Sequence, residues 1–167
     1  LSVLKLLHQL GAGFDIVSGG ELACALAVGA KGKDIVFSGV GKTQADMRMA
    51  LEVDVSCFNI ESIPELDRLN QVAASMSKVA RISVRVNPDV DPKTHPYIST
   101  GLKENKFGVA KEAAVALYQR AASLPAIQVA GIDCHIGSQI TTIEPYVDAL
   151  DRVLDLVEAI EAAGVPI

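Results

Sequence analysis

The strict alternation of short apolar strands with longer helical stretches is the feature that most constrains how this chain can fold. Five stretches have the composition or the alternating pattern of strands, and helical periodicity follows each of them. The expected strands cover residues 12–17, 35–37, 55–60, 80–86 and 128–134. Because parallel strands must be joined by long crossover connections, such alternation is typical of a parallel sheet. The sequence therefore predicts an α/β fold.

Capping residues mark where the helices begin. Ser18, Thr43 and Ser62 each stand directly before a helical stretch, where a hydroxyl group can accept a hydrogen bond from a free backbone amide. The expected helices cover residues 1–10, 18–28, 43–51, 62–77, 111–122 and 143–163. Between residues 87 and 105 the periodicity stops, and a loop this long in a compact domain is usually either functional or disordered.

Charge and motif spacing exclude several functional classes. The net charge of −5 and the lack of a Lys and Arg cluster argue against a nucleic-acid surface. No apolar run approaches the roughly 18 residues of a membrane-spanning helix, so we expect no membrane partner. His8, His95 and His135 lack the spacing of metal ligands, and we expect no metal site. Residues 39–43 look like a phosphate-binding loop, but its first glycine is replaced by Val36, so we interpret them as a strand–turn–helix junction.

The cysteines and the chain ends bear on location and completeness. Cys24, Cys57 and Cys134 are odd in number and form no C-x-x-C pair, which is typical of small buried residues in a reducing cytosol. We therefore expect a cytoplasmic protein. The N-terminus shows no signal-peptide pattern and no initiator methionine, so we expect residues 1–167 to be a single domain cut from a longer chain.

Polar side chains stand at the ends of the expected strands. They are Asp15, Ser38, Asn59, Arg85 and His135. By period-two counting they point inward at the carboxyl ends of the strands, while their apolar neighbours meet the helices. Such a rim is typical of a (β/α)8 active site, although about 250 residues are usual for a complete barrel. The sequence thus predicts parallel (β/α) units that form a partial TIM-type barrel. Arg85 can also simply pair with a carboxylate of a neighbouring strand, and Asp15 is one candidate.

The stretch from residue 129 to residue 139 carries the clearest functional signal. In a strand, Asp133 and His135 point to one face, so His135 offers a flat aromatic surface at the strand tip. Gly137 allows a sharp turn, and Ser138 can donate a hydrogen bond to an anion. A core histidine followed by an ordinary strand-to-helix turn explains the same residues equally well.

Five stretches, taken in order, resemble the successive motifs of the diaminopimelate decarboxylase family. This family belongs to the fold-type III enzymes that use pyridoxal 5'-phosphate, and it is related to ornithine decarboxylase and alanine racemase. The stretches are GFDIVSGGEL at 13–22, FSGVGKT at 37–43, RVNP at 85–88, TG at 100–101 through KFG at 106–108, and HIGSQ at 135–139. Together they cover nearly the whole chain.

The resemblance implies a fold, a cofactor and residue roles. The family's catalytic domain is a (β/α)8 barrel, of which this chain would hold strands two to six. His135 would be the catalytic residue, stacked on the ring of pyridoxal 5'-phosphate, and Ser138 would bind its phosphate. Arg85 and Asp15 would form the polar network beneath the ring, near its phenolic oxygen. The implied reaction converts meso-diaminopimelate to L-lysine, with the cofactor as an electron sink.

The resemblance also implies what lies outside the chain. The family's Schiff-base lysine, glycine-rich phosphate loop and substrate-reading residues would all lie beyond residues 1–167, so we expect the isolated chain to be inactive. Residues 87–105 would form a loop over the active-site mouth. The implied partners are an amino-acid substrate and a second copy in a homodimer. Three alternatives stay open: a decarboxylase for a different amino acid, a catalytically inactive homologue that binds a protein partner, and a small phosphate-binding module without pyridoxal phosphate.

Overall fold

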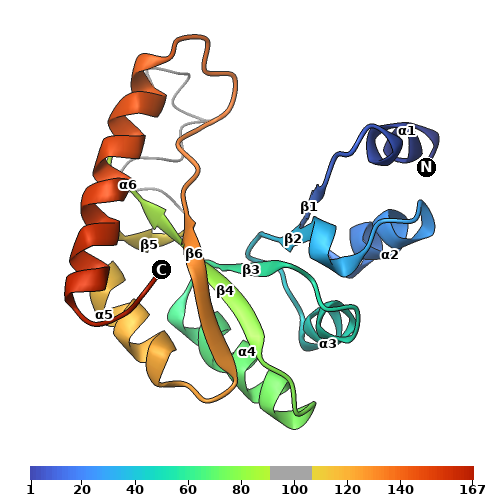
Figure 1. Ribbon diagram of the computed structural model, residues 1–167, viewed down its shortest axis with the longest axis horizontal. Helices are drawn as coiled ribbons and strands as arrows, with labels where there is room; N and C mark the ends of the chain where they lie inside the picture. The colour runs from blue at the N-terminus through green and yellow to red at the C-terminus, as the bar shows by residue number, and fades with distance from the viewer. Residues whose placement is uncertain (91–106) are drawn as a thin grey trace.

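The structure, a computed structural model, describes residues 1–90 and 107–167, and within them a parallel sheet is flanked by helices (Figure 1). The strands are β1 (Phe14–Ile16), β2 (Ile35–Phe37), β3 (Cys57–Ile60), β4 (Ala80–Asn87), β5 (Val109–Ala110) and β6 (Ile127–Asp133). Neighbours in the sheet follow the order β1, β2, β3, β4 and β5, while β6 also pairs with β4. Every pairing is parallel. The predicted α/β fold with a parallel sheet is confirmed.

The observed strands match the expected ones, with β5 as an addition. β1 and β3 begin later than predicted, at Phe14 and Cys57. The short β5 pairs with the end of β4 through Val86 opposite Val109. A strand of two residues has no period that a sequence pattern could reveal. The expected loop at residues 87–105 falls for the most part outside the described residues.

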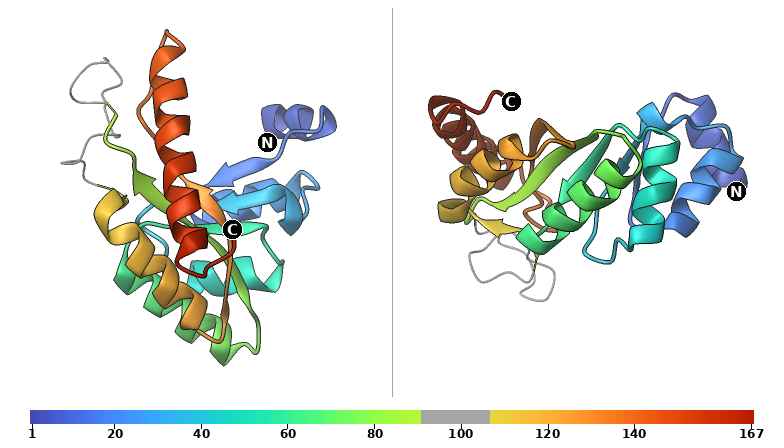
Figure 2. Two further views of the ribbon diagram at one scale, coloured as in Figure 1. Left: turned by 60° about the vertical axis from the view of Figure 1, so that its left-hand side comes forward. Right: turned by 90° about the horizontal axis from the view of Figure 1, so that it is seen from below.

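Helices flank the sheet in a row. They are α1 (Ser2–Gln9), α2 (Gly19–Ala27), α3 (Gln44–Glu52), α4 (Ile63–Ser75), α5 (Lys111–Ser123) and α6 (Glu144–Ala162), with a 3-10 turn η1 (Gly32–Asp34) before β2. The predicted caps are confirmed, because the hydroxyl groups of Ser18, Thr43 and Ser62 each accept a backbone hydrogen bond at the start of a helix. Figure 2 shows α2 to α5 along one face of the curved sheet. In the described ranges, no helix is long and apolar enough to cross a bilayer.

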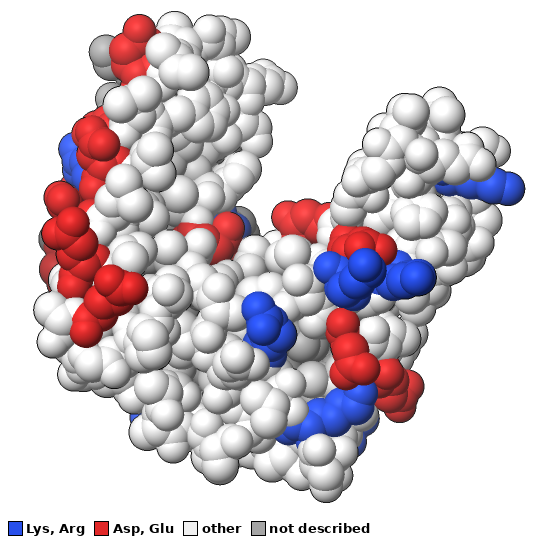
Figure 3. Space-filling model, in the orientation of Figure 1, with Lys and Arg blue, Asp and Glu red and all other residues white. Residues whose placement is uncertain are grey.

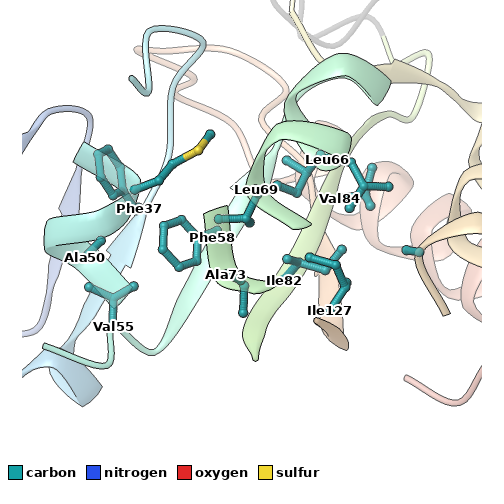
Figure 4. Packing of buried hydrophobic residues seen from close by; sticks show 14 of the residues in the cluster. Phe37, Ala50, Val55, Phe58, Leu66, Leu69, Ala73, Ile82, Val84 and Ile127 are labelled. Carbon is teal, nitrogen blue, oxygen red and sulfur yellow. The ribbon is translucent and has the colours of Figure 1, made fainter. Parts of the chain in front are cut away.

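The main core lies between the sheet and this row of helices. Phe58 on β3 and Ile82 and Val84 on β4 point into it, and each is at most 1% exposed. Leu69 of α4 packs against them from the helix side (Figure 4). Phe37 stacks on Phe58 with the ring centroids 5.9 Å apart. Because burial of these side chains drives folding, it also fixes the direction of the polar residues that alternate with them.

The opposite face of the sheet is hollowed and lies between two arms (Figure 3). One arm is formed by α1, and the other by α6 with the segment that follows β6 (Figure 1). Figure 3 shows acidic side chains along the outer edge of α6. Large apolar side chains of the α6 arm are at least half exposed: Ile143, Tyr146, Val147, Leu150 and Leu154. A curved parallel sheet with one hollowed face fits the predicted partial TIM-type barrel.

Candidate active site

A continuous chain of hydrogen bonds crosses the hollowed face from β1 to β4. The Ser38 hydroxyl, just after β2, donates to Asp15 Oδ1 of β1 at 2.5 Å. Asn59 Nδ2 of β3 donates to Ser38 Oγ at 3.0 Å, and Ser83 Oγ of β4 donates to Asn59 Oδ1 at 2.5 Å. The expectation that Asp15, Ser38 and Asn59 point inward together is therefore confirmed. These side chains form a polar floor whose members hold one another in place.

Arg85 on β4 makes its ion pair with Glu61, which follows β3. Its NH1 atom lies 3.2 Å from Glu61 Oε1 and 3.4 Å from Oε2, and the Glu61 side chain is only 2% exposed. The sequence had offered Asp15 as the partner of Arg85, and that interpretation is wrong. The Asp15 carboxylate accepts from Ser38 instead, because β1 lies too far along the sheet, beyond β2 and β3. The ring of Phe107 lies beneath the Arg85 guanidinium, 5.9 Å from its centroid.

A β-bulge directs Asp133 toward Arg85. β4 and β6 pair regularly up to Ile82 opposite Val129, but the next pair joins Ser83 to Gly131, so Ala130 is an extra residue. The bulge reverses the alternation along β6, and Asp133 therefore lies opposite Arg85 on the hollowed face. If the regular alternation continued through Ala130, Asp133 would share the helix-facing side with Ile127.

Asp133 lies opposite Arg85 and is affected by the charges of other predicted site residues. Burial raises the pKa of its carboxyl group, and the positive charge of Arg85 opposes that effect. The charges of Asp15, Glu61 and His135 also act on its pKa. Asp15, Arg85 and His135 are thus near enough for their charges to act on the pKa of Asp133, and this partly buried carboxyl group holds a proton more readily than an exposed one.

His135 and Ser138 lie on the segment after β6. The strand ends at Asp133, so His135 stands beyond its tip, and both side chains are exposed. The expected sharp turn is present, since Gly137 has φ of +147° and Gln139 has φ of +60°. The interpretation of His135 as a core histidine is wrong, because its side chain is exposed. Within the described residues, the hydrogen-bond chain of the polar floor does not include Ser138, and its anion-binding role stays a prediction.

Sequence reasoning missed a buried lysine close to this site. The Lys42 side chain is 0% exposed, and its Nζ donates to Gly39 O at 2.6 Å, Asn59 O at 2.7 Å and Glu65 Oε1 at 2.7 Å. Burial raises the pKa of Glu65, and the Lys42 charge opposes that shift. The interpretation of residues 39–43 as a strand–turn–helix junction is confirmed, because Thr43 caps α3. The sequence carries no local signal that this lysine turns inward.

The polar groups line a cleft of about 430 Å³ on the hollowed face. Asp15, Asn59, Ser83 and Asp133 contribute to its wall. In the part of the chain that the structure describes, no three His, Cys, Asp or Glu side chains are grouped to hold a metal ion. The arginine in this wall is Arg81, and Arg85 is not part of it. The carboxyl, amide and hydroxyl groups of the wall suit an organic ligand with polar parts.

Comparison with known proteins agrees with this arrangement. Residues 1–167 match the family model described as pyridoxal-dependent decarboxylase, pyridoxal binding domain. The chain is 63% identical over 166 residues to a diaminopimelate decarboxylase of Pseudomonas fluorescens, which covers 99% of this chain and 40% of that protein. The crystal structure of diaminopimelate decarboxylase from Helicobacter pylori complexed with L-lysine has a TM-score of 0.95 at 42% identity, over 99% of this chain and 42% of that chain.

A more distant structure shares the fold. The arginine decarboxylase of Paramecium bursaria Chlorella virus has a TM-score of 0.84 at 25% identity, over 98% of this chain and 41% of that chain. The present chain spans 40% of the length of the curated Pseudomonas fluorescens relative. The similarity therefore covers one part of each relative, and that part includes the hollowed polar face.

Proposed function

We propose, on the premise that this chain belongs to the pyridoxal-dependent decarboxylase family, that it forms the cofactor-binding region of a diaminopimelate decarboxylase. The reaction converts meso-diaminopimelate to L-lysine and CO2. One observation carries the choice of substrate: identity reaches 63% to a diaminopimelate decarboxylase but only 25% to an arginine decarboxylase. Because the fold is common to these proteins, the side chains must carry the difference in substrate.

The residues on the hollowed face fit pyridoxal 5'-phosphate by their chemistry. This cofactor has an aromatic ring, a phosphate group and a phenolic oxygen, so it requires a flat surface, hydrogen-bond donors and a cation. Arg85 supplies the cation, and its buried Nε has no hydrogen-bond partner among residues 1–90 and 107–167. A buried donor left unpaired costs roughly 1–3 kcal/mol, so this atom is suited to a bound acceptor. The exposed ring of His135 and the exposed hydroxyl group of Ser138 follow the carboxyl end of β6 at the same end of the sheet.

Each predicted site residue has a distinct task in this proposal. When bound, pyridoxal phosphate supplies an electron sink for the electron pair that remains as the α-carboxylate leaves as CO2. His135 stacks on the ring and fixes its plane, and Ser138 donates a hydrogen bond to the phosphate. Arg85 holds the negative charge of the phenolic oxygen. Asp15, held by the Ser38 hydroxyl, completes the polar network beneath the ring.

The proposal extends to domain organisation, assembly and location. Residues 1–167 form a single domain that holds strands two to six of a (β/α)8 barrel, and the active protein is a homodimer with an amino-acid substrate. The exposed apolar side chains of α6, such as Leu150 at 56%, support burial against further structure. The free thiols of Cys24, Cys57 and Cys134 support a reducing, cytoplasmic location.

A turnover assay with the full-length protein tests the substrate. The purified protein is loaded with pyridoxal phosphate and given meso-diaminopimelate, L-lysine, L-arginine or L-ornithine, and CO2 release is measured. We expect release from meso-diaminopimelate, with L-lysine as the product. Release only from another amino acid would reassign the substrate, and no release from any of them would favour the inactive homologue.

Two histidine variants test the site in the same protein. His135→Ala should lower turnover and weaken cofactor binding, because the ring loses its stacking surface. His8→Ala is the matched control, since His8 lies on α1 and its ring contacts Phe14 with centroids 6.3 Å apart. Equal behaviour of the two variants would remove His135 from the site.

A further inference from the structure

The Lys42 ammonium group links β3 to the segment after β2 and to α4, and all three of its protons are used in hydrogen bonds. Its Nζ donates to the main chain of Gly39 after β2, to the main chain of Asn59 in β3 and to the Glu65 carboxylate in α4. An ammonium group has three protons, so these acceptors satisfy it completely. Lys42 therefore has no donor left for a ligand, and any effect on the active site must pass through its partners.

The hydrogen bonds around Lys42 close into a ring. Glu65 Oε2 accepts from the backbone N–H of Glu61 at 2.9 Å, which fixes the main chain where β3 ends. Glu61 Oε1 accepts from Gly39 N at 3.1 Å, and Gly39 is also the residue whose carbonyl oxygen accepts from Lys42. The main chain and the side chain of Glu61 are thus bound by Glu65 and Gly39, and both of these residues also bind Lys42. We call Lys42, Gly39, Glu61 and Glu65 the lysine ring.

Arg85 is attached to the lysine ring through Glu61 alone among these residues. The NH1 contacts of 3.2 and 3.4 Å turn one edge of the guanidinium toward Glu61. The Nε atom, which has no hydrogen-bond partner in the described part of the chain, is left for another acceptor. Asp133 lies opposite Arg85 in the neighbouring strand. A small shift of Glu61 would therefore change the direction in which Arg85 presents its unpaired donor.

We propose that Lys42 and Glu65 are positioning residues, which orient the Arg85 guanidinium toward the cofactor through Glu61. This inference rests on the proposed function, in which Arg85 binds the phenolic oxygen of pyridoxal phosphate. A buried ion pair is weak evidence for a role in stability, because apolar residues of similar volume often serve stability as well. The lysine ring instead fixes the orientation of the Glu61 carboxylate, since each of its hydrogen bonds has a fixed donor and acceptor.

A double-mutant cycle in the full-length protein tests this inference. Lys42→Met/Glu65→Gln removes both charges together, so that neither is left alone and buried. The dissociation constant of pyridoxal phosphate and the visible absorbance of the bound cofactor are measured in the wild type and with Arg85→Ala. We expect the double substitution to weaken binding about tenfold and to shift the absorbance band in the wild type, but to weaken binding less than about twofold with Arg85→Ala, as for residues that act through one another.

A second ion pair provides the matched control. Lys78 Nζ likewise donates to a main-chain oxygen, Leu51 O at 2.6 Å, and to a carboxylate, Asp54 Oδ1 at 2.8 Å, but it lies at the amino ends of the strands. Lys78→Met/Asp54→Asn should leave the cofactor affinity unchanged. If the Lys42 variant does not fold, Glu61→Gln replaces it in the cycle and should show the same dependence on Arg85.

The outcomes separate this inference from the proposed function. An equal loss of affinity with and without Arg85, or no loss in either case, would overturn the positioning role alone. If Arg85→Ala by itself left the affinity and the absorbance unchanged, the role of Arg85 in the proposed function would fail and the inference with it.

Discussion

The hydroxyl group of Tyr118 should be worth about 2 kcal/mol to this structure. Tyr118 lies on α5, is 0% exposed, and its hydroxyl group links β4 to β6 beside the bulge. Its hydroxyl donates to Gly131 O at 2.8 Å and accepts from Val84 N at 3.3 Å. Tyr118→Phe keeps the ring and leaves these two buried backbone groups without that partner. An unsatisfied buried group costs roughly 1–3 kcal/mol, and a carbonyl oxygen with a second lone pair loses less than an amide.

Amide hydrogen exchange at Val84 is the direct assay for this prediction. A loss of about 2 kcal/mol corresponds to exchange that is ~30-fold faster, since every 1.4 kcal/mol is a factor of ten. Tyr146→Phe is the matched control, because Tyr146 on α6 is 51% exposed and the same atom is removed where water can replace it. A change of less than about threefold at Val84 in Tyr118→Phe would refute the reasoning, since it would show that the bulge satisfies its own backbone groups.

Three further predictions concern a glycine and two carboxyl groups. Gly108→Ala should lower the melting temperature of the protein more than Gly164→Ala. Both glycines have a positive φ, +84° and +88°, but of the two only Gly108 would bring a Cβ within 2.9 Å of a main-chain oxygen, that of Arg85. Equal melting temperatures of the two variants would contradict this. Hydrogen bonds from the side chain and the backbone of the α3 N-cap residue lower the pKa of Asp46. Its contribution to stability is therefore present above its usual pKa of 3.8 and is lost as the pH falls through the folded value. Asp46→Asn should reduce this loss of melting temperature at acidic pH, and an unchanged loss would count against the prediction. Burial raises the pKa of Asp133, so the folded state binds a proton more readily than the unfolded state. Stability should therefore fall as the pH rises from 3.8 to the folded pKa. Asp133→Asn should remove this loss of stability, and a loss that persists in the variant would belong to another group.

The regular strands made much of the site predictable. Asp15, Asn59 and Arg85 lie on the hollowed face because β1, β3 and β4 alternate without interruption. In β6, alternate residues lie on the same face only within each part of the strand on either side of the bulge. Counting from Asp133 to its neighbours assigned the right face, whereas counting from Ile127 across the bulge assigns the wrong one. A glycine inside an expected strand, here Gly131, is the signal that such a bulge is possible.

The ion-pair partners of side chains on different strands were harder to predict than the face of the sheet on which each side chain lies. The sequence indicated that Arg85 and a carboxylate share one face, but the choice between Asp15 and Glu61 depends on which strands are neighbours. Glu61 follows β3, which pairs directly with β4, and Asp15 belongs to β1. Lys42 was missed for a related reason. A lysine in a polar turn has the same local pattern whether its ammonium group reaches water or three buried acceptors.

The order of the strands also bears on how the chain can fold during synthesis. β1, β2, β3 and β4 lie side by side in the order in which a ribosome would make them, and β6 then joins β4. β1 starts at residue 14 and β2 at residue 35, so at roughly 5–20 residues per second the second strand emerges about 1–4 s after the first. Each newly made strand can therefore pair at once with the edge left by its predecessor. The bare edge of the growing sheet is exposed only for seconds, which limits the time in which it can pair with another nascent chain.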